Sequence, residues 1–194
     1  MLTIIDYKLG GVDKVADALN QAGVNFRITR NENDIIGSDK IILPGIEEAF
    51  SAVKKLHLLN LFTVLRIVKK PVLGIGLGMQ LLSEFSKEGD VACLGKFPGT
   101  VQKFSEPSSI IPFIQNATIR IEKNSPLFNK INEHDTFRFR NSYFLELNEY
   151  TTASADNRIR FTAAIEKDNY YGVQFHPEES GNAGLQLLLN FSEL

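Results

Sequence analysis

Short apolar runs alternate with amphipathic stretches through the first 88 residues, and this alternation constrains the fold more than any other feature of the chain. Short, mainly apolar runs bounded by turn residues are typical of the buried strands of a parallel sheet. They occupy residues 2–6, 41–43 and 72–75. Residues 25–29 alternate in polarity, which indicates a more exposed strand, and apolar side chains recur at helical spacing in residues 12–22, 49–68 and 79–85. This order predicts an α/β fold with a doubly wound, mostly parallel sheet.

The second half of the chain has a different pattern. Residues 97–122 and 134–175 are rich in Phe, Thr, Ile and Val and are interrupted by turn residues, which predicts short strands, several of them antiparallel. Leu185, Leu188 and Leu189 predict a closing helix. Because no long linker or internal repeat divides the chain, we expect residues 1–194 to form a single domain.

Composition excludes several classes of function. The net charge of −2 argues against nucleic-acid binding, which needs clustered Lys and Arg. A single cysteine excludes an intrachain disulfide framework and a cysteine-based zinc site. No apolar run approaches the ~18 residues that would span a membrane, and the first residues lack the pattern of a secretory signal. We therefore expect a cytoplasmic globular protein with no membrane partner, and nothing in the sequence indicates a metal or an organic cofactor.

Three alternate glycines, Gly74, Gly76 and Gly78, lie where a predicted strand passes into a predicted helix. A phosphate-binding loop of the form G-x-G-x-x-G would need another glycine at position 79, which is Met79. A nucleophile elbow needs small residues two positions on either side of a central Ser or Cys. Gly74 and Gly78 supply that clearance, but Gly76 has no side chain. A glycine-rich turn without chemistry is the third interpretation.

A second candidate site lies about 100 residues later, where a predicted strand ends in His176-Pro177-Glu178. Pro177 fixes the turn, so Glu178 can accept a hydrogen bond from one imidazole nitrogen and leave the other free to act as a base. The alternative is a histidine at a strand end beside a solvated acidic turn. His57 and His134 have polar or helix-surface neighbours, and we expect no function for them.

Several segments are similar in sequence and order to one known family. They are residues 4–7, 43–46, 71–82, 98–101 and 174–191. Together they resemble class I, triad-type glutamine amidotransferases, and most of all the glutaminase subunits of imidazole glycerol phosphate synthase. The resemblance covers nearly the whole chain. It implies a flavodoxin-like, mostly parallel sheet flanked by helices, with extra antiparallel strands in the second half.

The resemblance also implies a reaction. Family members hydrolyse glutamine to glutamate and ammonia with a cysteine nucleophile, a histidine and a glutamate, and ammonia passes to a (β/α)₈ cyclase in a heterodimer. By position, Gly76 stands at the nucleophile, and His176 and Glu178 complete the triad. The remaining matches are Gly45 and the N–H of Leu77 at the oxyanion hole, and Gln80, Ser142 and Tyr143 at the substrate glutamine.

Gly76 departs from the family pattern because a cysteine is expected there. Cys93 lies 17 residues further on, with no base at a recognisable spacing, and we expect it to be a small, partly buried apolar residue. Glycine adopts positive φ without strain, so the substitution can preserve the fold while it removes the chemistry. We therefore predict a chain that is deficient in glutaminase activity.

Other departures lie near the same site. Glu47 stands where the family has a second glycine, and its carboxylate would repel a developing oxyanion. Asn141 replaces a histidine of the family's His-Ser-Tyr. Lys8, Gly11 and residues 113–117 also differ from the family pattern. In relatives, the stretches that correspond to residues 113–117 and 141–143 lie near the substrate and partner face.

Four hypotheses about function follow. The chain is an amidotransferase subunit for histidine biosynthesis, or a non-catalytic pseudo-glutaminase that binds or regulates a barrel partner. It could instead be a paralogous subunit for nitrogen transfer in surface-sugar biosynthesis. An unrelated nucleotide-binding module is disfavoured by Met79 at the position where the phosphate loop needs glycine.

Overall fold

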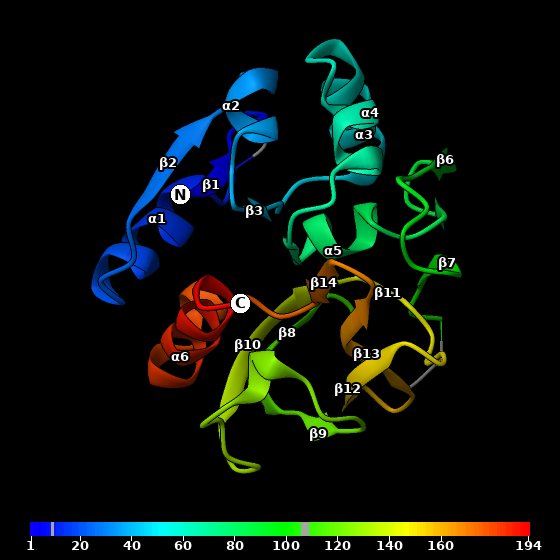
Figure 1. The fold of residues 1–194 in the computed structure, drawn as a ribbon. Coiled ribbons are helices and arrows are strands. Elements are labelled where there is room, and N and C mark those ends of the chain that lie inside the picture. Colours follow the sequence, from blue (N-terminus) through cyan, green and yellow to red (C-terminus); the bar gives the residue numbers. More distant parts are fainter. Residues whose placement is uncertain (9, 106–108) are drawn as a thin grey trace.

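A computed structural model describes residues 1–8, 10–105 and 109–194, and its centre is a mixed sheet with helices on both faces (Figure 1). In the described residues this sheet contains β1 (Leu2–Ile5), β2 (Phe26–Thr29), β3 (Lys40–Leu43), β4 (Val72–Ile75), β9 (Arg120–Ile121), β12 (Thr151–Asp156), β13 (Arg160–Lys167) and β14 (Tyr170–Val173). Its order is β2-β1-β3-β4-β14-β13-β12-β9. The first five strands are parallel, and the last three are added by antiparallel pairing.

Helices and smaller sheets complete the described structure. The helices are α1 (Val12–Gln21), α2 (Glu32–Ile36), α3 (Ala49–Leu58), α4 (Leu61–Ile67), α5 (Leu77–Leu81) and α6 (Gly181–Ser192), with 3₁₀ turns η1 (Pro126–Phe128) and η2 (Pro177–Glu179). One small sheet pairs β8 (Phe113–Thr118) with β10 (Thr136–Asn141). Another has the order β11 (Tyr143–Phe144), β7 (Thr100–Lys103), β5 (Phe85–Ser86) and β6 (Val91–Ala92).

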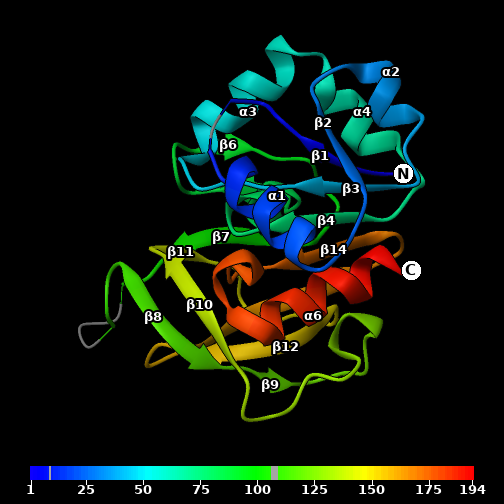
Figure 2. The ribbon, with the colours of Figure 1, turned by 90° about the vertical axis from the view of Figure 1, so that its left-hand side faces the viewer.

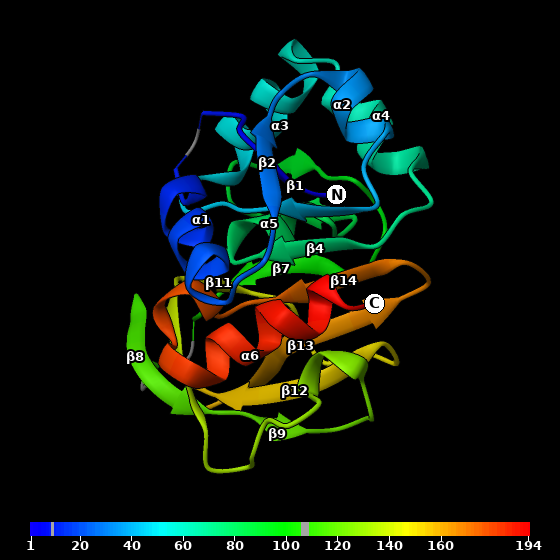
Figure 3. The same cartoon turned by 60° about the vertical axis from the view of Figure 1, so that its left-hand side comes forward.

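The two faces of the large sheet carry different helices. Figures 2 and 3 show α1 and α6 side by side across one face, and α3, α4 and α5 pack with the other. Successive strand residues point to opposite faces. Ile4 therefore belongs to the core beneath α1 and α6, whereas Ile5 belongs to the core beneath α3, α4 and α5. The predicted doubly wound α/β fold is confirmed, and β2 lies at a sheet edge as its alternating polarity predicts.

The helix predicted for residues 79–85 is too long. It ends at Leu81, and Phe85 instead lies in β5, which pairs with β7. The carbonyl oxygens of Leu81 and Leu82 accept the N–H groups of Leu94 and Lys96, at 2.8 and 2.7 Å, and so cannot accept from a further helical turn. The apolar spacing of this stretch thus results from burial on two different elements.

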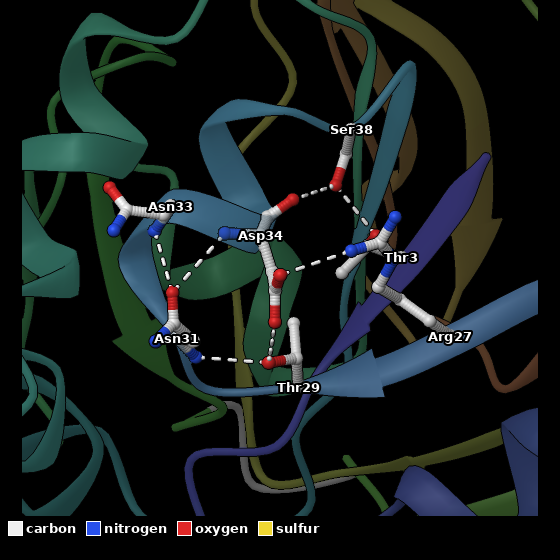
Figure 4. A network of polar contacts seen from close by, with 7 residues as sticks. All are labelled: Thr3, Arg27, Thr29, Asn31, Asn33, Asp34 and Ser38. Carbon is white, nitrogen blue, oxygen red and sulfur yellow. Dashed lines mark hydrogen bonds and ion pairs between the residues drawn. The ribbon is translucent and has the colours of Figure 1, made fainter.

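A short helix, α2, was not predicted from the sequence, because five residues are too few to show a helical repeat. Its N-terminus is capped by Asn31, whose side-chain oxygen accepts from the backbone N–H groups of Asn33 and Asp34. The Asp34 carboxylate in turn binds the side chains of Arg27 and Thr29, at 3.1 and 2.9 Å (Figure 4). Local polar contacts therefore fix this helix against β2.

Candidate active site

Three adjacent strands, β3, β4 and β14, end at the same edge of the sheet. The segments that follow them are residues 44–47, 76–78 and 174–178, which contain most of the site residues predicted from the sequence. Ligands of open α/β sheets bind outside the carboxyl ends of the strands. A cleft of about 270 Å³ opens at this edge, and it is the candidate site.

The elbow after β4 turns sharply at Gly76, which has φ +58° and ψ −115° and precedes α5. A Cβ atom added at Gly76 would lie 2.8 Å from His176 Cε1, 3.1 Å from His176 Nε2 and 3.0 Å from the Gly45 carbonyl oxygen. Position 76 therefore faces the imidazole ring. The backbone conformation there is one that glycine adopts without strain.

Gly74 and Gly78 provide the clearance that the spacing predicts. A Cβ at Gly78 would lie 1.8 Å from the Leu43 carbonyl oxygen, and a Cβ at Gly74 would lie 2.6 Å from the Gly78 carbonyl oxygen. Real Cβ atoms do not approach other atoms so closely. Strand, helix and the neighbouring strand β3 thus meet only because both residues are glycine.

The structure brings Gly45 and Leu77 together, but not as two donors for an anion. The Leu77 N–H donates to the Gly45 carbonyl oxygen over 3.1 Å. Behind this segment, the buried Tyr7 hydroxyl donates to the Pro44 carbonyl oxygen at 2.6 Å. Burial, and then the charge of Glu47, raises the pKa of Tyr7, so this hydroxyl keeps its proton at neutral pH. In this conformation the Leu77 N–H is not available to an oxyanion.

His176 and Glu178 form a buried pair. The imidazole Nδ1 lies 2.8 Å from Glu178 Oε1, and the two side chains are 3% and 2% exposed. The backbone N–H of His176 donates to the Arg138 carbonyl oxygen, and the Ser180 hydroxyl donates to the His176 carbonyl oxygen. Because Nδ1 lies against Glu178, Nε2 is the ring nitrogen that faces position 76.

Gln80, Ser142 and Tyr143 also line the cleft. The Gln80 side-chain nitrogen donates to the Tyr143 carbonyl oxygen at 3.0 Å and to Gln174 Oε1 at 2.9 Å. The neighbouring Asn141 donates from its side-chain nitrogen to the same Tyr143 carbonyl oxygen at 2.9 Å. These bonds join α5, the residue that follows β14, the end of β10 and the start of β11.

Two lining residues, Glu88 and Arg140, were not found from the sequence, because nothing in their local pattern separates them from ordinary surface charges. Glu88 Oε2 accepts the Ala49 N–H at 3.0 Å at the start of α3. Burial, and to a smaller extent Glu48, raises the pKa of Glu88 against the effect of that hydrogen bond. Arg140 binds Glu179 at 3.0 Å. Glu47 lines the cleft as well, so two carboxylates face it.

Cys93 does not line the cleft. Its side chain is buried in the core beneath α3, α4 and α5, and burial raises its pKa to about 11. Such a thiol is almost entirely protonated at neutral pH and is a poor nucleophile. Among the described residues, no group of three or more His, Cys, Asp or Glu side chains could hold a metal ion. In the same part of the chain, no helix has the length and apolar character needed to cross a membrane.

Comparison with known proteins identifies the class. The model of the family "Glutamine amidotransferase class-I" matches residues 3–193. The chain therefore belongs to the class I glutamine amidotransferase family. Within it, the chain is 40% identical over 192 residues to imidazole glycerol phosphate synthase subunit HisH of Haemophilus influenzae, with 99% of this chain and 96% of that protein covered. It is 38% identical to the subunit HisH of Vibrio parahaemolyticus, with 100% and 98% covered.

Solved structures show the same fold. A putative GMP synthase subunit from Thermoplasma acidophilum superimposes with a TM-score of 0.75 at 18% identity, over 99% of this chain and 92% of that one. The glutaminase domain of Trypanosoma brucei CTPS gives a TM-score of 0.67 at 15% identity, over 99% and 93%. At these identities the likeness concerns the fold alone.

Proposed function

We propose that this chain is the HisH-type subunit of a cytoplasmic imidazole glycerol phosphate synthase, and that it docks on a (β/α)₈ cyclase but does not hydrolyse glutamine. The similarity to HisH subunits over the full length supports the pathway and the type of partner. One observation carries the loss of activity. Position 76, which faces His176 Nε2, is a glycine and offers no nucleophilic atom.

The His176–Glu178 pair cannot replace the missing atom. In a triad the histidine takes a proton from the nucleophile, and the acid orients the histidine, but neither forms the acyl-enzyme. The buried Cys93 thiol does not face the cleft. Enzymes that lose a triad member keep only a residual rate about 10³–10⁴-fold above the uncatalysed rate in water, which comes from binding and the oxyanion hole. Here the Leu77 N–H is also engaged by Gly45, which removes part of that residual rate.

Exposed apolar side chains at the cleft support docking there. Ile46 and Ile114 line the cleft and are 49% and 47% exposed. Contiguous exposed apolar side chains around a cleft mark interaction surfaces. The cyclase would cover them and enclose the site.

The experiment measures two quantities on the purified chain mixed with its cyclase. The first is glutamate release from glutamine, and the second is the cyclase reaction with ammonium salts, with and without this chain. We expect no glutamate release and a complex that still forms. Glutamate release at a rate comparable to that of the subunit HisH of Haemophilus influenzae, assayed in its own synthase, would refute the loss of activity, and failure to form a complex would refute docking.

A further inference from the structure

Three cations gather around Tyr170, at the end of the sheet opposite the cleft. Strand β14 begins at Tyr170 and runs toward the cleft, so the residue and the cleft lie at opposite ends of this strand. Tyr170 is 4% exposed, and its hydroxyl donates to the carbonyl oxygens of Leu65 and Val68 at 2.9 and 3.1 Å. These bonds hold the tyrosine against the end of α4 and fix the position of its ring.

The cations come from three separate segments. Lys96, in the loop after β6, has its Nζ 4.9 Å from the centre of the Tyr170 ring, which is within the range of a cation–π contact. Lys167 lies directly opposite Tyr170 in the antiparallel pair of β13 and β14, so both side chains leave the same face of the sheet. Arg66 belongs to the last turn of α4, between the two residues that accept the Tyr170 hydroxyl.

The cluster has an excess of positive charge. None of the three side chains forms an ion pair within the described part of the chain. Burial, and then the charge of Arg66, lowers the pKa of Lys96, and Lys167 acts in the same direction. Asp168, in the turn between β13 and β14, is the one carboxylate that opposes this effect. Like charges so close together disfavour the folded chain unless an anion lies among them.

A ligand can reach the cluster from solvent. Arg66 is exposed, Lys96 and Lys167 are half-buried, and burial desolvates the ammonium group of Lys96 only in part. The Nζ of Lys167 lies 4.9 Å from the centre of the Tyr150 ring, so each of the two ammonium groups rests on an aromatic face. Side chains that are already positioned lose less conformational entropy when they bind a ligand.

We propose that Arg66, Lys96 and Lys167 bind a phosphate group, either the free ion or the phosphate of a small metabolite. Ammonium and guanidinium groups carry only donors, and phosphate has oxygens that accept from several of them at once. Three positive charges less the one negative charge of Asp168 leave two positive charges, which a phosphate dianion balances and a single carboxylate does not. The cluster is separate from the cleft, so the proposal goes beyond the proposed function and does not depend on it.

The test is a calorimetric titration of the intact chain at neutral pH and constant ionic strength. Inorganic phosphate and glycerol phosphate are the probes, and their relative affinities distinguish the free ion from a phosphate monoester. Sodium acetate supplies a carboxylate with a single charge, and sodium chloride controls for ionic strength. We expect saturable binding of both phosphates, at least about tenfold tighter than that of acetate, and shifts of the Tyr150 and Tyr170 ring signals in the same titration followed by NMR.

Variants identify the site. Lys96→Gln and Lys167→Gln should each weaken phosphate binding by about fivefold or more, because each removes one charge from the ligand. Lys96→Arg keeps the charge and should bind phosphate within about threefold of the unmodified chain, which separates charge from packing. Lys103→Gln is the matched control, because Lys103 also lies opposite a tyrosine in a strand pair, but that tyrosine is Tyr143 at the cleft. It should change the affinity less than about twofold.

The proposal is overturned if neither phosphate binds saturably, if acetate binds as tightly, or if both glutamine variants of the cluster bind phosphate like the unmodified chain. These results would leave the proposed function intact, because the assays with the cyclase concern the cleft. Glutamate release in those assays would refute the loss of glutaminase activity without bearing on the phosphate site.

Discussion

The carbonyl oxygen of Gly45 accepts the Leu77 N–H over 3.1 Å at the point where the elbow enters α5. This bond joins the end of β3 to the turn that follows β4. It also occupies the donor that an oxyanion at position 76 would use. The site therefore combines an intact His176–Glu178 pair with a position 76 that has no nucleophile and a donor that is already engaged.

Substitution of Gly76 should cost stability. At φ +58° and ψ −115° a residue with a Cβ is strained, and that atom would press on His176 Cε1 at 2.8 Å. We expect the free energy of unfolding of Gly76→Ala and of Gly76→Cys to be about 1–3 kcal/mol lower than that of the unmodified chain, which lowers Tm by roughly 2–10 °C. Thermal and urea unfolding of both variants measure this, and the alanine variant separates strain from effects of the thiol. An unchanged Tm in both would contradict the geometry of the elbow.

The Cys93 thiol should be inert in the folded chain. Its pKa of about 11 leaves on the order of one part in a thousand as thiolate at pH 8, and the side chain is buried. We expect labelling by iodoacetamide to be at least about 100-fold slower in the native chain than in urea. The Gly76→Cys variant adds a thiol beside His176 Nε2, which should label faster than Cys93. Rapid native labelling of Cys93 would show that it is accessible after all.

Glu88 should make stability depend on pH. Its pKa is raised mainly by burial, so its ionisation is unfavourable in the folded state. The contribution of protonated Glu88 to the free energy of unfolding is complete below the ordinary pKa of 4.5. It is lost as the pH rises through the raised pKa of the folded chain. Glu88→Gln keeps an acceptor for the Ala49 N–H and removes the charge, so the variant should gain stability relative to the unmodified chain between pH 4 and pH 7. Urea unfolding at both values measures the difference, and a difference that does not change with pH would refute the prediction.

The apolar rim of the cleft should be needed for docking. Ile114→Asp places a charge on a surface that the cyclase would desolvate, and we expect the complex to weaken by at least about tenfold. Ile67→Asp is the matched control, because Ile67 is 67% exposed at the end of α4 and does not line the cleft. Calorimetric titration with the cyclase gives both affinities. Equal losses for the two variants would place the interface elsewhere.

Much of the fold could be predicted from local patterns. The strands that end before Pro44 and Gly76 are short and apolar, and the antiparallel strands of the second half have the expected composition and turns. The length of α5 could not be predicted, since its end depends on N–H groups of Leu94 and Lys96 that come from a distant turn. Helix α2 depends on side-chain contacts that periodicity does not report.

The site could be predicted only in part. The His176-Pro177-Glu178 turn is local, so the hydrogen bond between imidazole and carboxylate follows from the sequence. The hydrogen bond from the Leu77 N–H to the Gly45 carbonyl oxygen and the position of Glu88 at the cleft depend on how separate elements pack.

The most direct test of the central claim is the rate of glutamate release from saturating glutamine by this chain in complex with the proposed cyclase partner. The subunit HisH of Haemophilus influenzae imidazole glycerol phosphate synthase, assayed in its own synthase under the same conditions, is the positive control. The missing nucleophile at position 76 predicts glutamate release at the level of a control without the chain, while the complex remains intact. Release at a rate comparable to that of the positive control would contradict the account.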